Sequence, residues 1–153
     1  MVTKTWRRNK PDVKQLLGFL PILKSNEKNS ETFKIAAHET FHKSLKILLD
    51  PILNFRNGIE LTLNNESIWF YPRISVIIAD WPEAATYCLT YKSAMSKFPC
   101  HFCLVTRDNL ANINLTTDEM ELRIPENMHT YLNQKLENSV CIESLHNYFW
   151  DFP

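Results

Sequence analysis

The clearest pattern along the chain is a stripe of apolar residues that begins after Ser30. Apolar side chains recur there at spacings of three and four, as on one face of an amphipathic helix, at Phe33, Ala37, Phe41, Leu45, Leu48, Leu49 and Ile52. Pro51 predicts the end of this helix, because proline has no backbone N–H to continue the hydrogen-bond ladder. The pattern predicts one long helix that ends at about Asp50.

Strand patterns lie on both sides of this helix. The run over residues 16–23 is apolar, contains a proline and is bounded by polar residues, which favours a buried strand over a helix. Residues 59–63 alternate apolar and polar, and two asparagines separate them from a returning strand at 68–71, so that they predict a hairpin. Residues 74–79 are almost continuously apolar and β-branched, which is typical of a central strand covered on both faces.

Weaker patterns follow the predicted central strand. Asp80, with a proline and a glutamate just behind it, predicts the start of a helix that reaches about residue 91. Residues 98–103 form a tight Pro/Cys segment, residues 125–137 predict a short helix, and the aromatic cluster at 148–150 predicts an apolar anchor. The order strand, long helix, hairpin, central strand, helix predicts an α/β layered fold with a helical C-terminal part.

Composition mainly excludes classes of protein. A length of 153 residues fits one domain, and a hydrophobic fraction of 44% argues against wholesale disorder. The only two glycines, Gly18 and Gly58, lie far apart, which excludes a P-loop and a Rossmann fingerprint, since both need clustered glycines. We find neither a secretion signal nor an apolar run of about 18 residues, and therefore expect an intracellular protein without a membrane segment.

The charges sum to zero but are unevenly distributed. The first 107 residues carry 15 basic and 9 acidic side chains, whereas the rest of the chain carries 2 and 8. Arg7, Arg8 and Lys10 belong to a basic N-terminal arm over residues 1–13. This arm is either a solvated tail or a nucleic-acid contact, and both interpretations stay open.

Asp80 is the first candidate for chemistry, because it lies where the apolar run gives way to a helix. A carboxylate at the carboxyl edge of an α/β sheet can hold a divalent metal ion for phosphoryl chemistry. Aspartate is also a favoured N-cap, and Glu83 completes the spacing of a capping box. The two roles are compatible.

The long helix carries a second candidate, the H-E-x-x-H motif over residues 38–42. In zinc proteases two histidines at this spacing hold the metal, and the glutamate acts as general base. A small zinc metalloprotease using His38, Glu39 and His42 is therefore one alternative. Against it, His38 flanks the apolar stripe, and the third ligand would have to come from the hairpin.

Cys100 and Cys103 form a C-x-x-C pair, which supplies half of a tetrahedral zinc site. Histidines and one cysteine occur downstream, but no second paired motif accompanies them. Disulfides are not expected in an intracellular protein. Zinc at this pair is therefore a hypothesis that rests on two ligands.

Six segments carry a family resemblance when they are taken in order. They are LGFLP at 17–21, FHKSLKILLDPI at 41–52, NGIE at 57–60, YPRI and IADWPE within 71–83, PCHFCLV at 99–105, and NYFWDFP at 147–153. In this order they resemble the landmarks of Plavaka-type transposases, CACTA-like elements that are abundant in fungi. The resemblance covers most of residues 16–153, and it makes His42 a family helix residue, so that the H-E-x-x-H match becomes fortuitous.

The resemblance implies that residues 14–153 are part of an RNase H-like transposase core. In such enzymes acidic residues hold two divalent ions, Mg²⁺ or Mn²⁺, for DNA strand cleavage and transfer. The second catalytic carboxylate of the family matches Asp80, while the first and the last lie upstream and downstream of the matched segments. We therefore expect a truncated transposase-like protein that is catalytically inactive alone.

Other expectations concern partners. The main alternative to an inert remnant is a retained DNA- or protein-binding module that uses the basic residues over 4–28. DNA is then the partner, and a retained transposase-like function implies a nuclear location. If the strand at 74–79 lacks its sheet neighbours, its open edge favours self-association.

Overall fold

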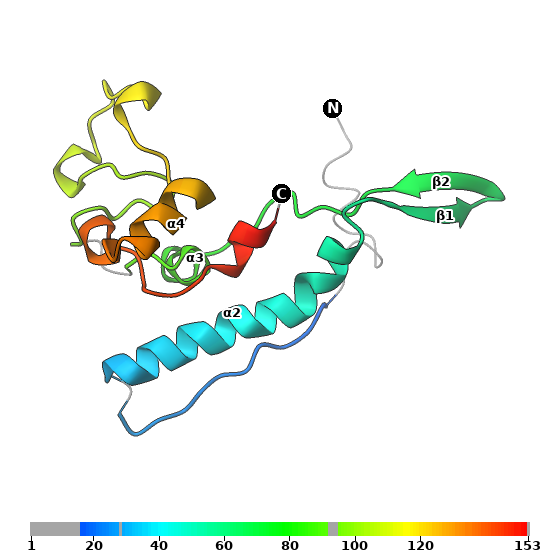
Figure 1. Cartoon of the computed structure of the whole chain (residues 1–153), viewed down its shortest axis with the longest axis horizontal. Helices are drawn as coiled ribbons and strands as arrows, with labels where there is room; N and C mark the ends of the chain where they lie inside the picture. The colour runs from blue at the N-terminus through cyan, green and yellow to red at the C-terminus, as the bar shows by residue number, and fades with distance from the viewer. Residues whose placement is uncertain (1–15, 28, 92–94, 153) are drawn as a thin grey trace.

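The computed structural model describes residues 16–27, 29–91 and 95–152. A long helix runs beside a lobe built of short helices and loops, and a hairpin projects from the end of this helix, away from the lobe (Figure 1). The regular elements are α2 (Glu31–Asn54), β1 (Ile59–Leu63), β2 (Glu66–Phe70), α3 (Trp81–Cys88) and α4 (Pro125–Asn133). Short 3₁₀ turns are η2 (Arg107–Asn109), η3 (Thr117–Glu119), η4 (Glu137–Val140) and η5 (Tyr148–Asp151). The predicted mixed α/β class is confirmed at this level.

Helix α2 confirms the long helix, with Ser30 as its N-cap. The Ser30 hydroxyl oxygen accepts a hydrogen bond from the Phe33 backbone N–H at 3.3 Å. The predicted end at about Asp50 is wrong, because the helix continues through Pro51 to Asn54. The proline forfeits one backbone hydrogen bond near the helix end. The residues that follow it, Ile52 and Leu53, pack against the core and hold the last turn in place.

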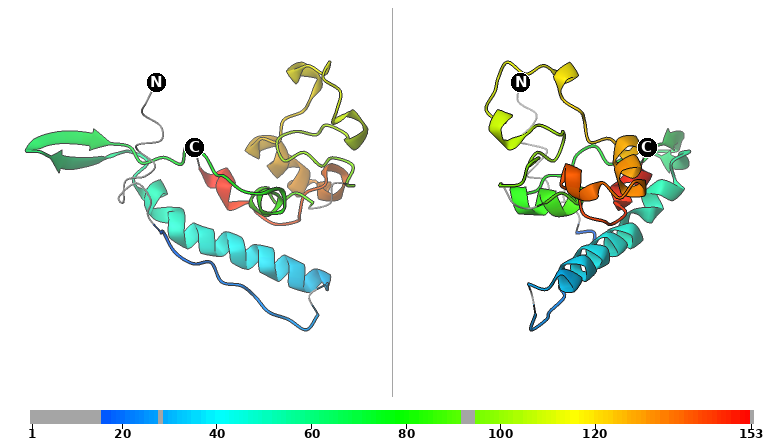
Figure 2. Two further views of the ribbon diagram at one scale, coloured as in Figure 1. Left: turned by 180° about the vertical axis from the view of Figure 1, so that it is seen from behind. Right: turned by 60° about the vertical axis from the view of Figure 1, so that its left-hand side comes forward.

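The hairpin is confirmed and projects away from the rest of the molecule (Figures 1 and 2). Strands β1 and β2 are antiparallel, with Ile59 opposite Phe70 and Leu61 opposite Ile68. Asn64 and Asn65 turn the chain with φ values of 53° and 67°, the left-handed conformation that two-residue hairpin turns require. Almost all of its side chains are exposed, so the hairpin adds little to the core.

The two other predicted strands are wrong within the described residues. Residues 16–23 form no strand and run beside α2, with Phe19 and Ile22 each 86% exposed (Figure 1). Residues 74–79 link the hairpin to α3 without pairing, and Ile78 is 89% exposed. A strand needs a neighbour to satisfy its backbone groups. Both apolar runs could pair as strands, but no strand among the described residues lies beside them.

The core consists of two clusters. The first joins Leu45 and Leu49 of α2 to Tyr148 of η5, and Tyr148 is only 3% exposed. The second joins Met128 of α4 to residues 140–142. The C-terminal aromatic segment is therefore an apolar anchor, as predicted.

Both shorter predicted helices are confirmed, with earlier ends. Helix α3 stops at Cys88, because Leu89 adopts a left-handed backbone with φ 51°. Helix α4 ends at Asn133 rather than at residue 137. A terminating left-handed residue is most often glycine, so a leucine in this role carries no local sequence signal.

Replacing Gly58 by alanine should lower the free energy of unfolding by about 2 kcal/mol. Gly58 has φ +87°, and an added Cβ would collide with the Trp69 ring and lie 2.9 Å from the Tyr71 ring. Urea unfolding followed by circular dichroism measures the change. The control is Gly18→Ala, whose Cβ would meet only the flexible end of Leu48 at 3.0 Å. Equal losses in both variants would contradict the role of backbone conformation at Gly58.

Candidate functional site

Asp80 lies at the N-terminus of α3 and caps it. Its Oδ1 accepts a hydrogen bond from the Glu83 backbone N–H at 2.8 Å, and its backbone is extended with φ −73° and ψ 172°. The interpretation as an N-cap is confirmed. The second carboxylate oxygen takes no part in the cap, so a metal-ligand role of Asp80 is compatible with this geometry and stays a prediction.

A groove of about 620 Å³ runs beside Asp80. One wall is the exposed apolar run, with Val76 and Ile77, and the opposite wall comes from the C-terminal aromatic segment, with Phe149. The Asp80 carboxylate therefore stands at the rim of an open, largely apolar groove.

His101 lines the same groove and contacts Trp81, with ring centroids 4.4 Å apart and planes inclined by 49°. Its Nδ1 lies 2.7 Å from the Thr90 hydroxyl. Burial, followed by the nearby charge of Arg123, lowers the pKa of His101 below its ordinary value. This direction favours the neutral imidazole at pH 7, in contact with Trp81 and Thr90.

Arg123 is a structural residue that the sequence analysis missed. Its guanidinium donates to the backbone carbonyls of Cys100 (3.0 Å), Phe98 (3.2 Å) and Val140 (2.8 Å). These bonds tie the Pro/Cys segment to η4. Its one sequence signal is its place as one of two basic residues in the acidic C-terminal part.

Cys100 and Cys103 are free thiols within this Pro/Cys segment, and Cys103 is buried. Burial raises the pKa of Cys103, which favours the thiol over the thiolate that binds metals. Among the described residues no three His, Cys, Asp or Glu side chains gather to hold a metal ion. His129 and His146 instead stack on each other, with centroids 5.5 Å apart. Zinc at the cysteine pair stays a prediction.

The H-E-x-x-H motif has structural partners. His42 is 5% exposed; its Nε2 lies 3.0 Å from the Thr86 carbonyl oxygen, and its Nδ1 accepts the Tyr148 backbone N–H at 3.3 Å. A neutral imidazole protonated at Nε2 satisfies both bonds. A metal at His42 would have to displace one of them, so the arrangement favours a role in the core.

The other two members of the motif point to different partners. His38 Nδ1 lies 3.5 Å from the Glu143 carboxylate, and both side chains are mostly buried. Glu39 pairs with Lys43 at 2.7 Å on the exposed side of α2. The three side chains therefore do not converge on one point. Arg7, Arg8 and Lys10 lie outside the described residues.

Comparison with known proteins gives a family. A family model described as Plavaka transposase matches residues 1–153. No curated protein and no solved structure matches this chain significantly. Across the described part of the chain, no helix has both the length and the apolar character that crossing a bilayer requires.

The free energy of unfolding should fall as the pH is lowered below about 6.5. Burial holds the pKa of His42 below its ordinary value. As the pH falls, His42 is therefore protonated in the unfolded chain before it is protonated in the native protein. Stability is therefore complete above pH 7 and declines toward pH 5.5, by at most about 1.4 kcal/mol per pH unit for one proton. Urea unfolding between pH 5.5 and 8 measures this slope.

The variant His42→Gln keeps a donor and an acceptor but does not titrate, so its stability should depend less steeply on pH. A residual slope is expected, because the pKa of His101 is lowered in the same direction. Parallel pH profiles of the wild type and the variant would show that His42 is not the group responsible.

Proposed function

This chain belongs to the Plavaka transposase family, and from that premise we propose that it takes part in DNA transposition. The observation that carries the proposal is the match of the family model over residues 1–153. Membership supports a transposase-like function with DNA as the partner. Further parts of the proposal are a nuclear location and a fungal host.

The proposed chemistry of the family domain is metal-dependent cleavage and transfer of DNA strands in an RNase H-like core. Asp80 would supply one carboxylate for Mg²⁺ or Mn²⁺, since the cap uses only one of its oxygens. The described residues do not complete such a site, because they bring no group of three potential ligands together. The other carboxylates must come from outside the described residues, so we expect the isolated chain to be inactive, as a truncated element would be.

The exposed run over residues 74–79 supports the RNase H-like part of the proposal. Val76 is 69% exposed and Ile78 is 89% exposed, although their β-branched side chains suit a covered sheet. The run leads directly into Asp80. A neighbouring strand in an assembled transposase would pair it, and the isolated chain would associate with itself through the same edge.

Two further contacts belong to the proposal. Arg7, Arg8 and Lys10 would bind the phosphates of duplex DNA. A zinc ion at Cys100 and Cys103 would order the Pro/Cys segment, but it needs two more ligands than the described residues bring there.

The isolated chain should bind duplex DNA with an affinity that falls steeply as salt rises. The triple variant Arg7→Ala, Arg8→Ala, Lys10→Ala should make the slope of log K against log salt less steep by about 2.7. Each phosphate contact releases about 0.9 counterion when the protein binds, and the variant lacks three such contacts. Fluorescence anisotropy at salt concentrations from about 50 to about 200 mM measures this salt dependence of the affinity.

The matched control removes three lysines of α2, Lys34, Lys43 and Lys46, which all pair with carboxylates of the same helix. It changes the net charge equally but should keep the wild-type slope. If both triple variants showed the same loss of salt dependence, DNA binding could not be assigned to the arm. A wild type that binds no DNA would contradict the proposed function.

Two substitutions separate the cap from the metal-ligand role of Asp80. Asp80→Asn keeps an oxygen for the cap and should change the stability by less than about 0.5 kcal/mol, whereas Asp80→Ala should cost about 1 kcal/mol. A plasmid-nicking assay with Mn²⁺ or Mg²⁺ should show no cleavage by the isolated wild type. Cleavage by the isolated wild type would contradict the expected inactivity. If Asp80→Asn then abolished this cleavage, the result would support Asp80 as a metal ligand.

A further inference from the structure

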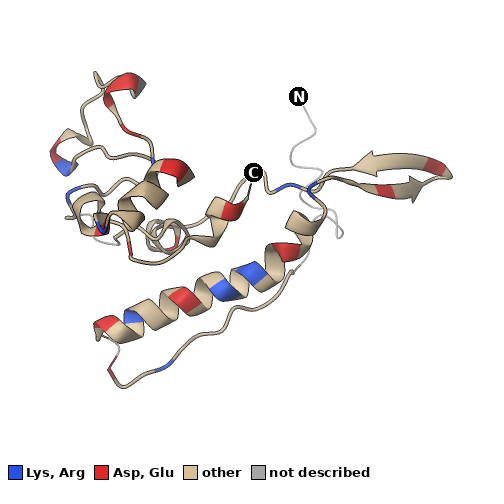
Figure 3. Ribbon diagram, in the orientation of Figure 1, with Lys and Arg blue, Asp and Glu red and all other residues tan. Residues whose placement is uncertain are grey.

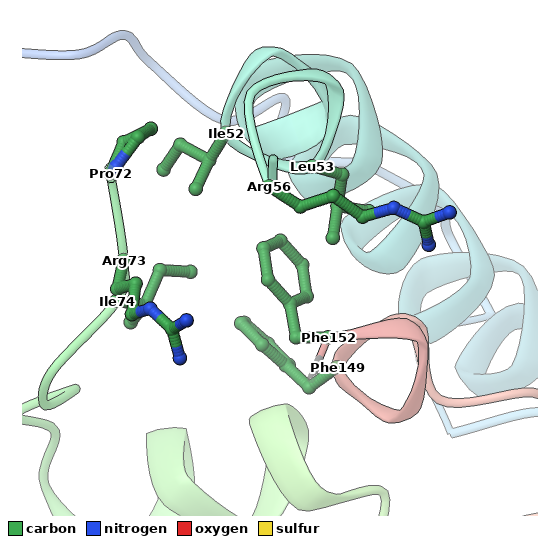
Figure 4. Close-up of a pocket in the computed structure, with 8 residues that line it drawn as sticks. All are labelled: Ile52, Leu53, Arg56, Pro72, Arg73, Ile74, Phe149 and Phe152. Atoms are coloured by element: carbon green, nitrogen blue, oxygen red, sulfur yellow. The ribbon is translucent and has the colours of Figure 1, made fainter. Parts of the chain in front are cut away.

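We propose that a cavity at the C-terminal end of α2 binds one unstacked nucleotide of a DNA strand, with the base inside and adjacent phosphates of the strand on Arg56 and Arg73. The cavity measures about 270 Å³ and lies between the end of α2, residues 72–74 and η5 (Figure 4). The inference rests on the proposed DNA function and names a contact that this function does not assign.

The interior of the cavity suits a flat ring. The phenyl rings of Phe149 in η5 and of Phe152 just after it have centroids 6.2 Å apart and planes inclined by 34°. Ile52 of α2 and Ile74 of the connecting segment add aliphatic walls (Figure 4). Proteins hold unpaired bases on such aromatic and apolar surfaces, largely irrespective of sequence.

The rim of the cavity carries two unneutralised cations. Arg56 extends from the end of α2 and Arg73 from the opposite wall, and both residues are exposed (Figure 4). Among the described residues neither guanidinium makes a hydrogen bond or an ion pair, although the Arg56 backbone N–H donates to the Leu53 carbonyl at 3.1 Å. By contrast, Arg123 is held by backbone carbonyls, and Arg107 contacts Asp108 at 3.5 Å. Figure 4 shows the two guanidinium groups at separate places on the rim, where they favour anions such as the successive phosphates of a DNA strand.

A nucleotide uses both parts of the cavity, which other occupants do not. An aliphatic side chain of a second copy would fill the apolar interior but leave Arg56 and Arg73 unpaired. An acidic peptide would pair the arginines but leave the aromatic interior empty. Basic segments lie at the base of the hairpin as well as on α2 and in the lobe (Figure 3), and next to that base Trp69 (56% exposed) and Tyr71 (52% exposed) offer rings for neighbouring bases.

The test uses the full chain and two short DNA strands of equal charge. One strand carries a single thymine among abasic positions, and the other is entirely abasic. The wild type should bind the thymine strand about tenfold more tightly, because stacking of one base is worth about that factor or more. Fluorescence anisotropy gives both dissociation constants.

Two variants separate the base contact from the phosphate contact. Phe152→Leu keeps the apolar volume without the ring and should lose most of the preference for thymine. The double variant Arg56→Gln, Arg73→Gln should weaken the binding of both strands about tenfold. The matched control, Lys97→Gln with Arg107→Gln, removes the same charge from a segment at the opposite end of the molecule from the hairpin (Figure 1) and should stay within about twofold of the wild type.

Equal binding of both strands by the wild type, or equal effects of the two double variants, would overturn the inference. An acidic peptide that competes as well as the thymine strand would overturn it in favour of a protein partner. If duplex DNA binds through the arm while these strands show no preference, the cavity assignment fails and the proposed function stands. Binding of no DNA at all would overturn both.

Discussion

The contact between His42 and the C-terminal aromatic segment holds this molecule together. The His42 imidazole joins three elements, since one nitrogen bonds the Thr86 carbonyl at the end of α3 and the other accepts the Tyr148 N–H of η5. The Tyr148 hydroxyl then donates to Asp50 of α2 at 2.8 Å. Hydrogen bonds from Lys46 and from Tyr148 keep the pKa of Asp50 below its ordinary value. Helix α2 would otherwise have few partners to cover its apolar stripe.

Both candidate sites depend on this contact. It directs Phe149 and Phe152 into the space between α2 and residues 72–74, where they form the interior of the cavity. It also places the end of α3 against α2, while the start of α3 presents Asp80 at the rim of the groove. Phe149 lines both the cavity with Arg56 and Arg73 and the groove beside Asp80, so one aromatic segment contributes to both candidate sites. We propose the first for binding of DNA, and the second for chemistry only together with further carboxylates.

Local signals explain which elements were predictable. The Ser30 cap, the two-asparagine turn and the Asp80 cap each act within four residues, and all three elements begin where the sequence predicts them. The runs at 16–23 and 74–79 failed as strands, because a strand exists only by pairing with distant backbone. The helix end predicted at Pro51 was wrong for a related reason. Packing of Ile52 and Leu53 against the core outweighs the one hydrogen bond that the proline cannot make.

The sequence by itself determined the helices, the hairpin, the absence of glycine-rich phosphate loops and the resemblance to a transposase family, which the family match confirms. Only the tertiary structure decided what the polar side chains do. His42 resembles a zinc ligand by spacing, but its partners lie 44 and 106 residues away and are backbone groups. Arg123 and the cavity between Arg56 and Arg73 have no motif at all. Their roles depend on atoms that folding brings together from distant parts of the chain, and such proximity leaves no mark on local sequence.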